Sequence, residues 1–191
     1  MRRSFVTQSL LVLALISAGT AHAMDVKPFV KAGYDFGGDT LVTVTFSDGS
    51  TETVKANEGF YLGGGASIVS DSKRIEMELS LAYKFSLINA SNGDIEFTRL
   101  PLEAVVFYRW DRVRLGGGLT YHIKPELEGS GIASPIDVEF DDALGFVLQG
   151  DYRVTDKMAI GLRYTNLKYE VSGTSASAKS NGLGLTFSYR F

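Results

Sequence analysis

Apolar and polar residues alternate with a period of two through most of the chain beyond about residue 25. In the clearest stretch, residues 75–87, apolar side chains occupy the odd positions and polar or small ones the even positions. This alternation indicates a β-strand with one apolar face. The stretch is long for a strand of a soluble protein, but its length suits a tilted strand that crosses a bilayer and projects beyond the lipid.

The same pattern recurs seven more times and predicts an all-β chain of eight strands. One irregularity stands out: Ile95 and Phe97 are out of phase with the apolar positions that follow them. We therefore expect a bulge or a lumenal aromatic side chain near Thr98. The seven further strands are expected at about 29–36, 60–68, 100–108, 113–124, 144–153, 158–165 and 183–191.

The connections between these strands alternate in length. Short ones at 71–73, 110–112 and 155–157 alternate with longer polar ones at about 39–57, 89–94, 125–142 and 172–180. This places every tight turn at one end of the sheet, as in outer-membrane barrels with short periplasmic turns and long external loops. Within the first long connection, residues 41–46 and 51–55 flank Ser47-Asp48-Gly49-Ser50, which predicts an additional hairpin.

The N-terminal residues have the features of an export signal. Arg2 and Arg3 precede an apolar run over residues 10–16, and Ala21-His22-Ala23 fits the small-residue cleavage pattern. The run is too short to span a bilayer. We predict a signal peptide at 1–23, cleavage between Ala23 and Met24, and a barrel domain at 24–191.

Composition removes several other classes of protein. The chain has no cysteine, so disulfide scaffolds, thiolate zinc sites and thiol nucleophiles are excluded. Its formal net charge of -3 argues against a nucleic-acid partner, which requires a basic surface. No stretch of the chain after the export signal has the continuous apolar length of a transmembrane helix.

Alternation alone does not say whether the apolar face points into a soluble, lipocalin-like carrier or outward into lipid. Aromatic residues on this face gather near both strand ends, as expected at two lipid–water interfaces, while aliphatic residues hold the strand centres. We therefore predict that the apolar face contacts lipid. The expected belts contain Tyr108, Trp110, Tyr152, Tyr189 and Phe191 at the short-turn end, and Phe36, Phe60, Tyr83, Phe85, Tyr121 and Tyr164 at the other.

The export signal, the eight alternating strands, Leu100-Pro101-Leu102-Glu103 and the terminal Tyr189-Arg190-Phe191 together resemble small bacterial outer-membrane barrels of the OmpA-barrel, OmpX and opacity-protein group. The resemblance covers the chain after the export signal. It implies that the last strand is the recognition signal for the barrel-assembly machinery and that the external loops mediate adhesion or envelope interactions. The residues that match this assembly signal are Gly184, Leu185, Phe187, Tyr189 and Phe191. Gly182 stands where the group usually has a polar residue.

The polar face carries charges of both signs. Eight strands leave room only for side chains or one small ligand, so we expect an interior network of ion pairs and hydrogen bonds; the alternative is a gated pore that opens when these charges exchange partners. The residues expected in the network are Glu76, Glu78, Lys84, Glu103, Arg114, Asp151, Arg153, Arg163 and Arg190.

No catalytic, cofactor or metal site is predicted. His122, the only histidine after the export signal, points inward, and no local serine motif accompanies it; an outer-membrane lipid-modifying enzyme would need such a constellation. Gly63-Gly64-Gly65 and Gly116-Gly117-Gly118 lie in strands without a following helix, so they are not phosphate loops. The acidic third loop lacks the spacing of a calcium loop and is expected to be solvated.

The resulting prediction is an eight-stranded antiparallel up-and-down transmembrane β-barrel in the outer membrane. We expect a monomer in contact with membrane lipid and lipopolysaccharide, with a structural and surface-display role. The alternatives left open are a small gated pore, a periplasmic carrier and a lipid-modifying enzyme.

Overall fold

The computed structural model describes residues 25–46, 49–90 and 93–191. The predicted signal peptide and the predicted cleavage site at Ala23 and Met24 lie outside the described residues, as do positions 47–48 of the predicted hairpin turn and 91–92 of the second loop. In the part of the chain that is described, no helix is long and apolar enough to cross a bilayer.

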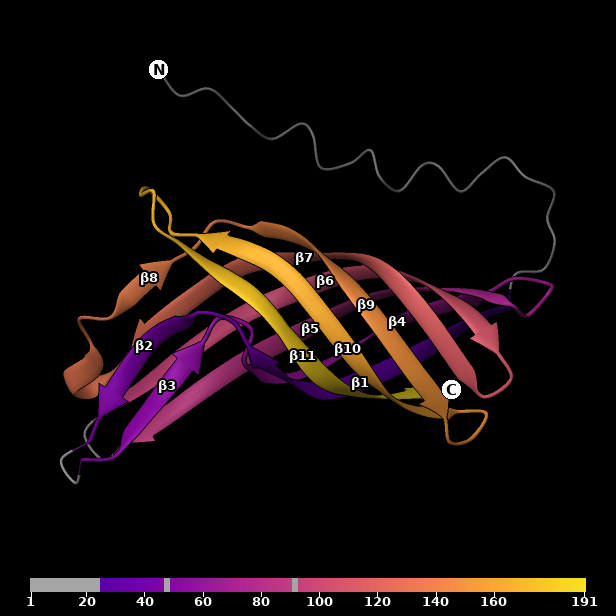
Figure 1. The fold of residues 1–191 in the computed structure, drawn as a ribbon, viewed down its shortest axis with the longest axis horizontal. Coiled ribbons are helices and arrows are strands. Elements are labelled where there is room, and N and C mark those ends of the chain that lie inside the picture. The colour runs from indigo at the N-terminus through magenta and orange to yellow at the C-terminus, as the bar shows by residue number, and fades with distance from the viewer. Residues whose placement is uncertain (1–24, 47–48, 91–92) are drawn as a thin grey trace, which may run out of the picture.

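Eight long strands form the wall of a closed antiparallel barrel (Figure 1). These are β1 (Asp25–Gly37), β4 (Gly59–Val69), β5 (Ile75–Ala90), β6 (Gly93–Trp110), β7 (Val113–Gly129), β9 (Ala143–Arg153), β10 (Met158–Glu170) and β11 (Ser177–Arg190). Between them lie β2 (Thr40–Thr45), β3 (Thr51–Lys55), the short 3-10 helix η1 (Gly131–Ala133) and β8 (Asp137–Glu139).

Each wall strand pairs with the wall strands before and after it in the chain, and β1 closes the circle by pairing with β11 from Phe29 opposite Arg190 to Gly37 opposite Gly182. The predicted up-and-down barrel is therefore confirmed. Closure leaves no unpaired edge in the wall, which a membrane-spanning sheet requires because lipid offers no hydrogen-bond partners.

The apolar face of the wall points outward. Leu62, Leu162 and Leu185 have exposed fractions of 59%, 64% and 54%, while the charged side chains between them are buried inside. Such exposure of large aliphatic residues is costly in water and favourable in hydrocarbon. The alternative of a soluble carrier with an apolar cavity is therefore wrong.

The two aromatic groups lie where the alternation predicts them, on the outer surface near opposite strand ends. At the short-turn end Trp110 is 77% exposed and Phe191 61%. At the other end Phe36 and Phe60 are exposed, and Phe60 makes an edge contact with Phe85 at a centroid distance of 5.8 Å. Figure 1 shows β2, β3 and β8 at this second end and the C terminus at the opposite one.

The predicted irregularity near Thr98 is confirmed in both of its forms. The pairing of β6 with β7 shifts between Thr98 and Leu100, because β7 holds one extra residue at Lys124, whose φ is 46°. The Phe97 side chain is fully buried in the lumen. Ile95 and Phe97 therefore belong to the inward face of a continuous strand.

Several strands are longer than predicted. β1 begins at Asp25 rather than near Phe29, and the predicted long connection at 89–94 is wrong, because Asn89 pairs with Asp94 and Ala90 with Gly93. The connection predicted at 172–180 is also too long, since β11 begins at Ser177. At the end opposite the short turns the wall extends further because apolar side chains fill the lumen there, as described below. The predicted hairpin within 39–57 is confirmed as β2 and β3, which pair with each other.

Candidate functional site: the barrel interior and its outer end

The lumen near the short turns holds a compact ionic cluster, here called the inner network: Glu76, Glu78, Arg109, Arg114, Asp151 and Arg190. Arg114 is its centre. Its Nη1 lies 2.7 Å from Glu76 Oε1 and also contacts Glu78, and its Nε lies 2.7 Å from Asp151 Oδ2. Arg190 and Arg109 also pair with Glu76, at 2.6 and 3.3 Å. Three acidic and three basic groups therefore balance one another within the wall.

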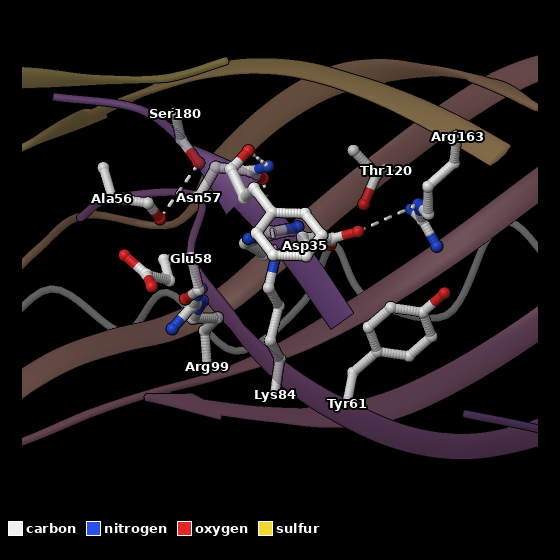
Figure 2. A network of polar contacts seen from close by, with 12 residues as sticks. Asp35, Ala56, Asn57, Glu58, Tyr61, Lys84, Arg99, Thr120, Arg163 and Ser180 are labelled. Atoms are coloured by element: carbon white, nitrogen blue, oxygen red, sulfur yellow. Dashed lines mark hydrogen bonds and ion pairs between the residues drawn. The ribbon is translucent and has the colours of Figure 1, made fainter. Parts of the chain in front are cut away.

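Further along the lumen, a second cluster forms the middle network: Lys31, Asp35, Lys84, Glu103 and Arg163. The Glu103 carboxylate contacts Arg163 and lies 2.5 Å from Lys31 Nζ, while Asp35 Oδ2 lies 2.6 Å from Lys84 Nζ. Figure 2 shows Asp35, Lys84 and Arg163 converging from different strands. Since these partners are far apart in sequence, each pair joins two parts of the wall.

Glycines on the inward face make room for these side chains. A Cβ at Gly184 would meet the Asp35 carboxylate, and one at Gly161 would meet that of Asp151. In the second glycine triplet, a Cβ at Gly116 would meet the Phe107 ring, over which the Arg114 guanidinium stacks at 4.1 Å. The close approach of a large side chain is a usual reason for glycine in a strand.

At the outer end the lumen changes character and becomes apolar. Eleven buried residues, here called the outer core, meet there: Val54, Ala56, Ile88, Ile95, Phe97, Leu127, Phe140, Ala143, Leu167, Tyr169 and Ala178. Phe97 packs edge-on against Tyr169 and Phe140, with centroid distances of 5.8 Å in both cases. This part of the barrel is filled like the core of a soluble sandwich.

The segment after β3 closes the outer core. Ala56 and Asn57 are fully buried; Ser180 Oγ donates to the Ala56 carbonyl at 3.1 Å, and Lys84 Nζ donates to Asn57 Oδ1 at 3.3 Å. Figure 2 shows this segment beside Arg99, which also donates to the Glu58 carbonyl. The segment after β3 is thus hydrogen-bonded to the middle network through Lys84.

The structure brings most of the predicted lumenal residues into the two networks. Glu76, Glu78, Arg114, Asp151 and Arg190 lie in the inner one, and Lys84, Glu103 and Arg163 in the middle one. Arg153 lies apart from both: it donates to the Asp111 carbonyl and lines a 420 Å³ cavity at the short-turn end of the barrel. The alternation correctly predicts that Arg153 lies on the polar face of its strand. It lies outside both networks because it is the last residue of β9.

Sequence reasoning omitted four interior residues that carry contacts. These are Lys31, Asp35, Arg99 and Arg109. All four lie on the polar face of their strands, so the same alternation would have found them. Other interior residues are harder to find from the sequence. Asn57 follows a hairpin and lies in no strand, and the apolar residues of the outer core lie where both faces of a strand are apolar.

His122 lies inward as predicted, and its Nδ1 is 2.5 Å from the Tyr169 hydroxyl. Both side chains are buried between the middle network and the outer core. A nucleophilic triad needs a serine-type nucleophile and an orienting carboxylate beside the histidine, and this arrangement supplies neither. Within the described ranges, no group of three or more side chains is suited to hold a metal ion.

The residues of the predicted assembly signal lie on β11 and at its end. Leu185 and Phe187 face outward, Phe191 is exposed, and Tyr189 is half-buried and meets Phe191 edge-on at 5.3 Å. Gly184 faces the lumen beside Asp35 and Arg163. Leu185, Phe187, Tyr189 and Phe191 thus form an apolar row on the outer surface, whereas Gly184 lies against side chains of the lumen.

Charge is distributed unevenly over the external end. In the described parts of 38–58, 86–98, 124–142 and 166–181, acidic residues outnumber basic ones threefold. On β6, β7 and β8 like charges even lie directly opposite one another: Glu96 faces Glu128, Glu128 faces Asp137, and Glu126 faces Glu139. The acidic residues are Asp39, Glu52, Glu58, Asp94, Glu96, Glu126, Glu128, Asp137, Glu139, Asp141, Asp142 and Glu170; the basic ones are Lys55, Lys124, Lys168 and Lys179.

This crowding affects the titration of Glu126. Partial burial, followed by the charge of Glu128, raises the pKa of Glu126 above its usual value. The Glu139 and Asp137 carboxylates across the ladder act in the same direction. The external sheet is therefore a surface on which negative charge accumulates.

Comparison with known proteins agrees with this architecture. Residues 11–191 match the model of the outer membrane protein beta-barrel domain family, whereas no curated protein matches the sequence. The fold is similar to that of Neisserial surface protein A (12% identity, covering 89% of this chain and all of that one, TM-score 0.53). It is also similar to Ail, the attachment invasion locus protein of Yersinia pestis, solved with the heparin analogue sucrose octasulfate (16% identity, 88% and 99% coverage, TM-score 0.54).

The closed eight-stranded wall, the outward apolar band and the family match over nearly the whole chain agree on one assignment, which also places the protein in the outer membrane. The chain belongs to the outer membrane protein β-barrel family.

Proposed function

We propose that this barrel is a surface-display protein whose external end binds a partner outside the cell, and that it has no catalytic role. The outer core is the observation that carries the proposal. It fills the barrel above the ionic networks and joins the β2–β3 hairpin to the wall, so the extended strands form a rigid platform. A rigid platform presents a binding surface at a lower cost in conformational entropy than mobile loops do.

Two further features support an interaction role. The names of the structural neighbours refer to attachment, invasion and a surface location, although identities of 12% and 16% carry the fold and not the partner. The exposed acidic sheet of β7 and β8 offers a charged surface of the kind that steers a partner by long-range attraction.

Adhesion of cells provides the direct test. The full chain is expressed in a non-adherent Gram-negative strain, and adhesion to epithelial monolayers is compared with that of the empty strain. A second variant has residues 40–55 replaced by a short Gly-Ser linker, and the heat-dependent shift on SDS gels verifies that each barrel is folded. We expect the full chain to raise adhesion and the hairpin variant to lose the gain. Equal adhesion of the full chain and the empty strain would refute an adhesive role.

The pore is the second candidate, because the middle network is built from re-pairable charges on separate strands. Conduction would require these pairs and also the outer core to open. We therefore expect silent planar bilayers with the verified folded protein. Reproducible single-channel steps that change in Glu103→Ala or Arg114→Ala would favour the pore instead.

Three partner predictions remain proposals: contact with lipopolysaccharide, recognition of the last strand by the assembly machinery, and a monomeric state. The outward aliphatic and aromatic bands support the lipid contact. The outer aromatic row of β11 supports recognition by the assembly machinery.

A further inference from the structure

A cleft of about 390 Å³ lies on the outside of the barrel between the β2–β3 hairpin and the wall strands. Its floor is aromatic and aliphatic, formed by Phe60, Phe85 and Leu87, and its rim carries Glu52 and Glu58. In the described part of the chain no basic side chain lines it. The cleft thus combines apolar side chains with two carboxylates, and each feature favours a different kind of ligand.

The position of Glu58 results from contacts on both sides of the wall. From the lumen, the fully buried Arg99 donates to the Glu58 carbonyl. On the outside, the Tyr34 hydroxyl donates to Glu58 Oε1 at 2.9 Å. The next residue, Gly59, has a φ of 146°, and a Cβ there would meet the Phe85 carbonyl. The backbone is therefore fixed so that this carboxylate lies at the cleft and not in the lumen.

The aromatic side chains are also held in place. Phe60 and Phe85 are cross-strand partners on β4 and β5 and meet edge-on at 5.8 Å, and Tyr83 lies 5.8 Å from Phe85 on its other side. Phe60 is 42% exposed and Leu87 46%. The cleft belongs to the outer interface and not to the hydrocarbon, because carboxylates such as Glu52 and Glu58 are costly in lipid.

We propose that this aromatic–acidic cleft binds a lysine or arginine side chain from a basic segment of an extracellular protein partner. A cation over an aromatic face is stabilised by the ring quadrupole, and a carboxylate at the rim adds a charge-assisted hydrogen bond. The excess of acidic residues over the rest of the external end attracts the same basic segment at longer range. The inference rests on the proposed interaction function and specifies the chemistry of the partner.

The same charges disfavour two other occupants. A sulfated polyanion of the heparin type, the class of ligand bound in the Ail structure, would meet Glu52 and Glu58 with like charge. The phosphates of lipopolysaccharide would do so as well. We therefore do not expect this cleft to bind a polyanion of the kind present in the Ail structure.

The test measures binding of a fluorescent peptide of four Lys-Leu repeats to the full barrel in an uncharged maltoside detergent. The cleft variant is E52Q/E58Q, which keeps the side-chain size and the acceptor for Tyr34. The matched control D71N/D156N removes two exposed charges from short turns at the opposite end of the barrel. We expect the dissociation constant to rise roughly tenfold in the cleft variant and less than about twofold in the control. The heat-dependent gel shift verifies folding of all variants.

A third variant tests the aromatic contribution. F85L keeps an apolar floor and removes the ring, and we expect it to weaken peptide binding about threefold. Three results would overturn the proposal: wild-type affinity in E52Q/E58Q, equal weakening in D71N/D156N, or equal binding of a Glu-Leu repeat peptide. Retention of purified lipopolysaccharide by the wild type and its loss in E52Q/E58Q would assign the cleft to lipid and also overturn it.

The outcome can be separated from that of the adhesion test. If cells adhere but the cleft variants bind the peptide normally, the surface function stands and the cleft assignment fails. If the peptide binds through the cleft but the full chain gives no adhesion, the basic ligand stands and the adhesive role fails.

Discussion

At the scale of single residues, the interior is dominated by charges whose partners come from other strands. Arg114 satisfies three carboxylates at once and stacks on Phe107. Buried pairs are weak evidence of net stabilisation, but removing one partner leaves an uncompensated charge. Loss of Arg114 would therefore leave the three carboxylates that it contacts short of one positive charge.

Replacing Arg114 by alanine should lower the free energy of unfolding by about 3–5 kcal/mol, because Glu76, Glu78 and Asp151 would lose their shared cation. The control is Arg112→Ala, which removes an exposed arginine in the adjacent turn and should change stability by less than about 0.5 kcal/mol. Urea unfolding in detergent, followed by tryptophan fluorescence, measures both. Equal stability of the two variants would mean that the inner network contributes little.

Gly184 has a predicted role in assembly and an observed neighbour in the lumen. A Cβ there would meet the Asp35 carboxylate, so Gly184→Ala should destabilise the barrel by about 1–3 kcal/mol through overpacking. Gly117→Ala, on the outward face with its nearest contact at 3.1 Å, serves as the control. Refolding of purified protein in detergent, without assembly machinery, measures the packing effect. Normal refolding combined with poor assembly in cells would assign the defect to recognition instead.

At the scale of elements, the strand extensions depend on the outer core. β5 and β6 continue to pair up to Ala90 and Gly93, and the buried side chains of Ile88 and Ile95 lie opposite each other near that end. Burial of apolar surface stabilises these extensions in water, where the outward-facing lipid contacts no longer contribute. The external end is thus held together by a different force from the membrane-embedded part.

Truncating Phe97 to alanine should loosen the external ends without opening the embedded wall. The change removes the contacts with Phe140 and Tyr169 and should cost about 3–5 kcal/mol locally. Hydrogen exchange should accelerate in the outer parts of β5, β6 and β10 and stay slow near the short turns. Uniform acceleration along the strands would show that the two halves unfold as one unit.

The β7–β8 ladder should respond to pH through Glu126. Because its folded-state pKa is raised, its contribution favours the folded ladder at low pH and is lost as pH rises through the raised value. Glu126→Gln should therefore slow hydrogen exchange in β8 at pH 7 and have little effect near pH 4. The exposed, ion-paired Glu170 provides the control in Glu170→Gln. A slowing that is equal at both pH values would exclude titration as its cause.

At the scale of the whole molecule, the barrel has three zones along its axis: the inner network, the middle network and the outer core. The first two pair opposite charges within a wall that faces lipid, and the third closes the external end. Transport of a solute through the lumen would need all three zones to rearrange, and the proposed surface-display role requires no such rearrangement.

Much of this architecture follows from local pattern alone. The period of two along residues 75–87 and its repeats determine strand type, strand number and the two faces, because successive side chains of a strand point to opposite sides. Short turns such as 110–112 make neighbouring strands antiparallel. The polar faces also contain Lys31, Asp35 and Arg99, so the identity of the lumenal residues was accessible from the sequence.

The pairings inside the barrel were decided only by the tertiary structure. Arg114 meets Asp151, and Glu103 meets Arg163, because closure and register bring distant strands to the same height. Arg153 shows what the alternation does not predict. Its position on the polar face followed from the sequence, but its location at the end of β9 separates it from both networks. Likewise, Val54 of β3 joins the outer core because the hairpin folds back over the lumen, a contact that no local periodicity encodes.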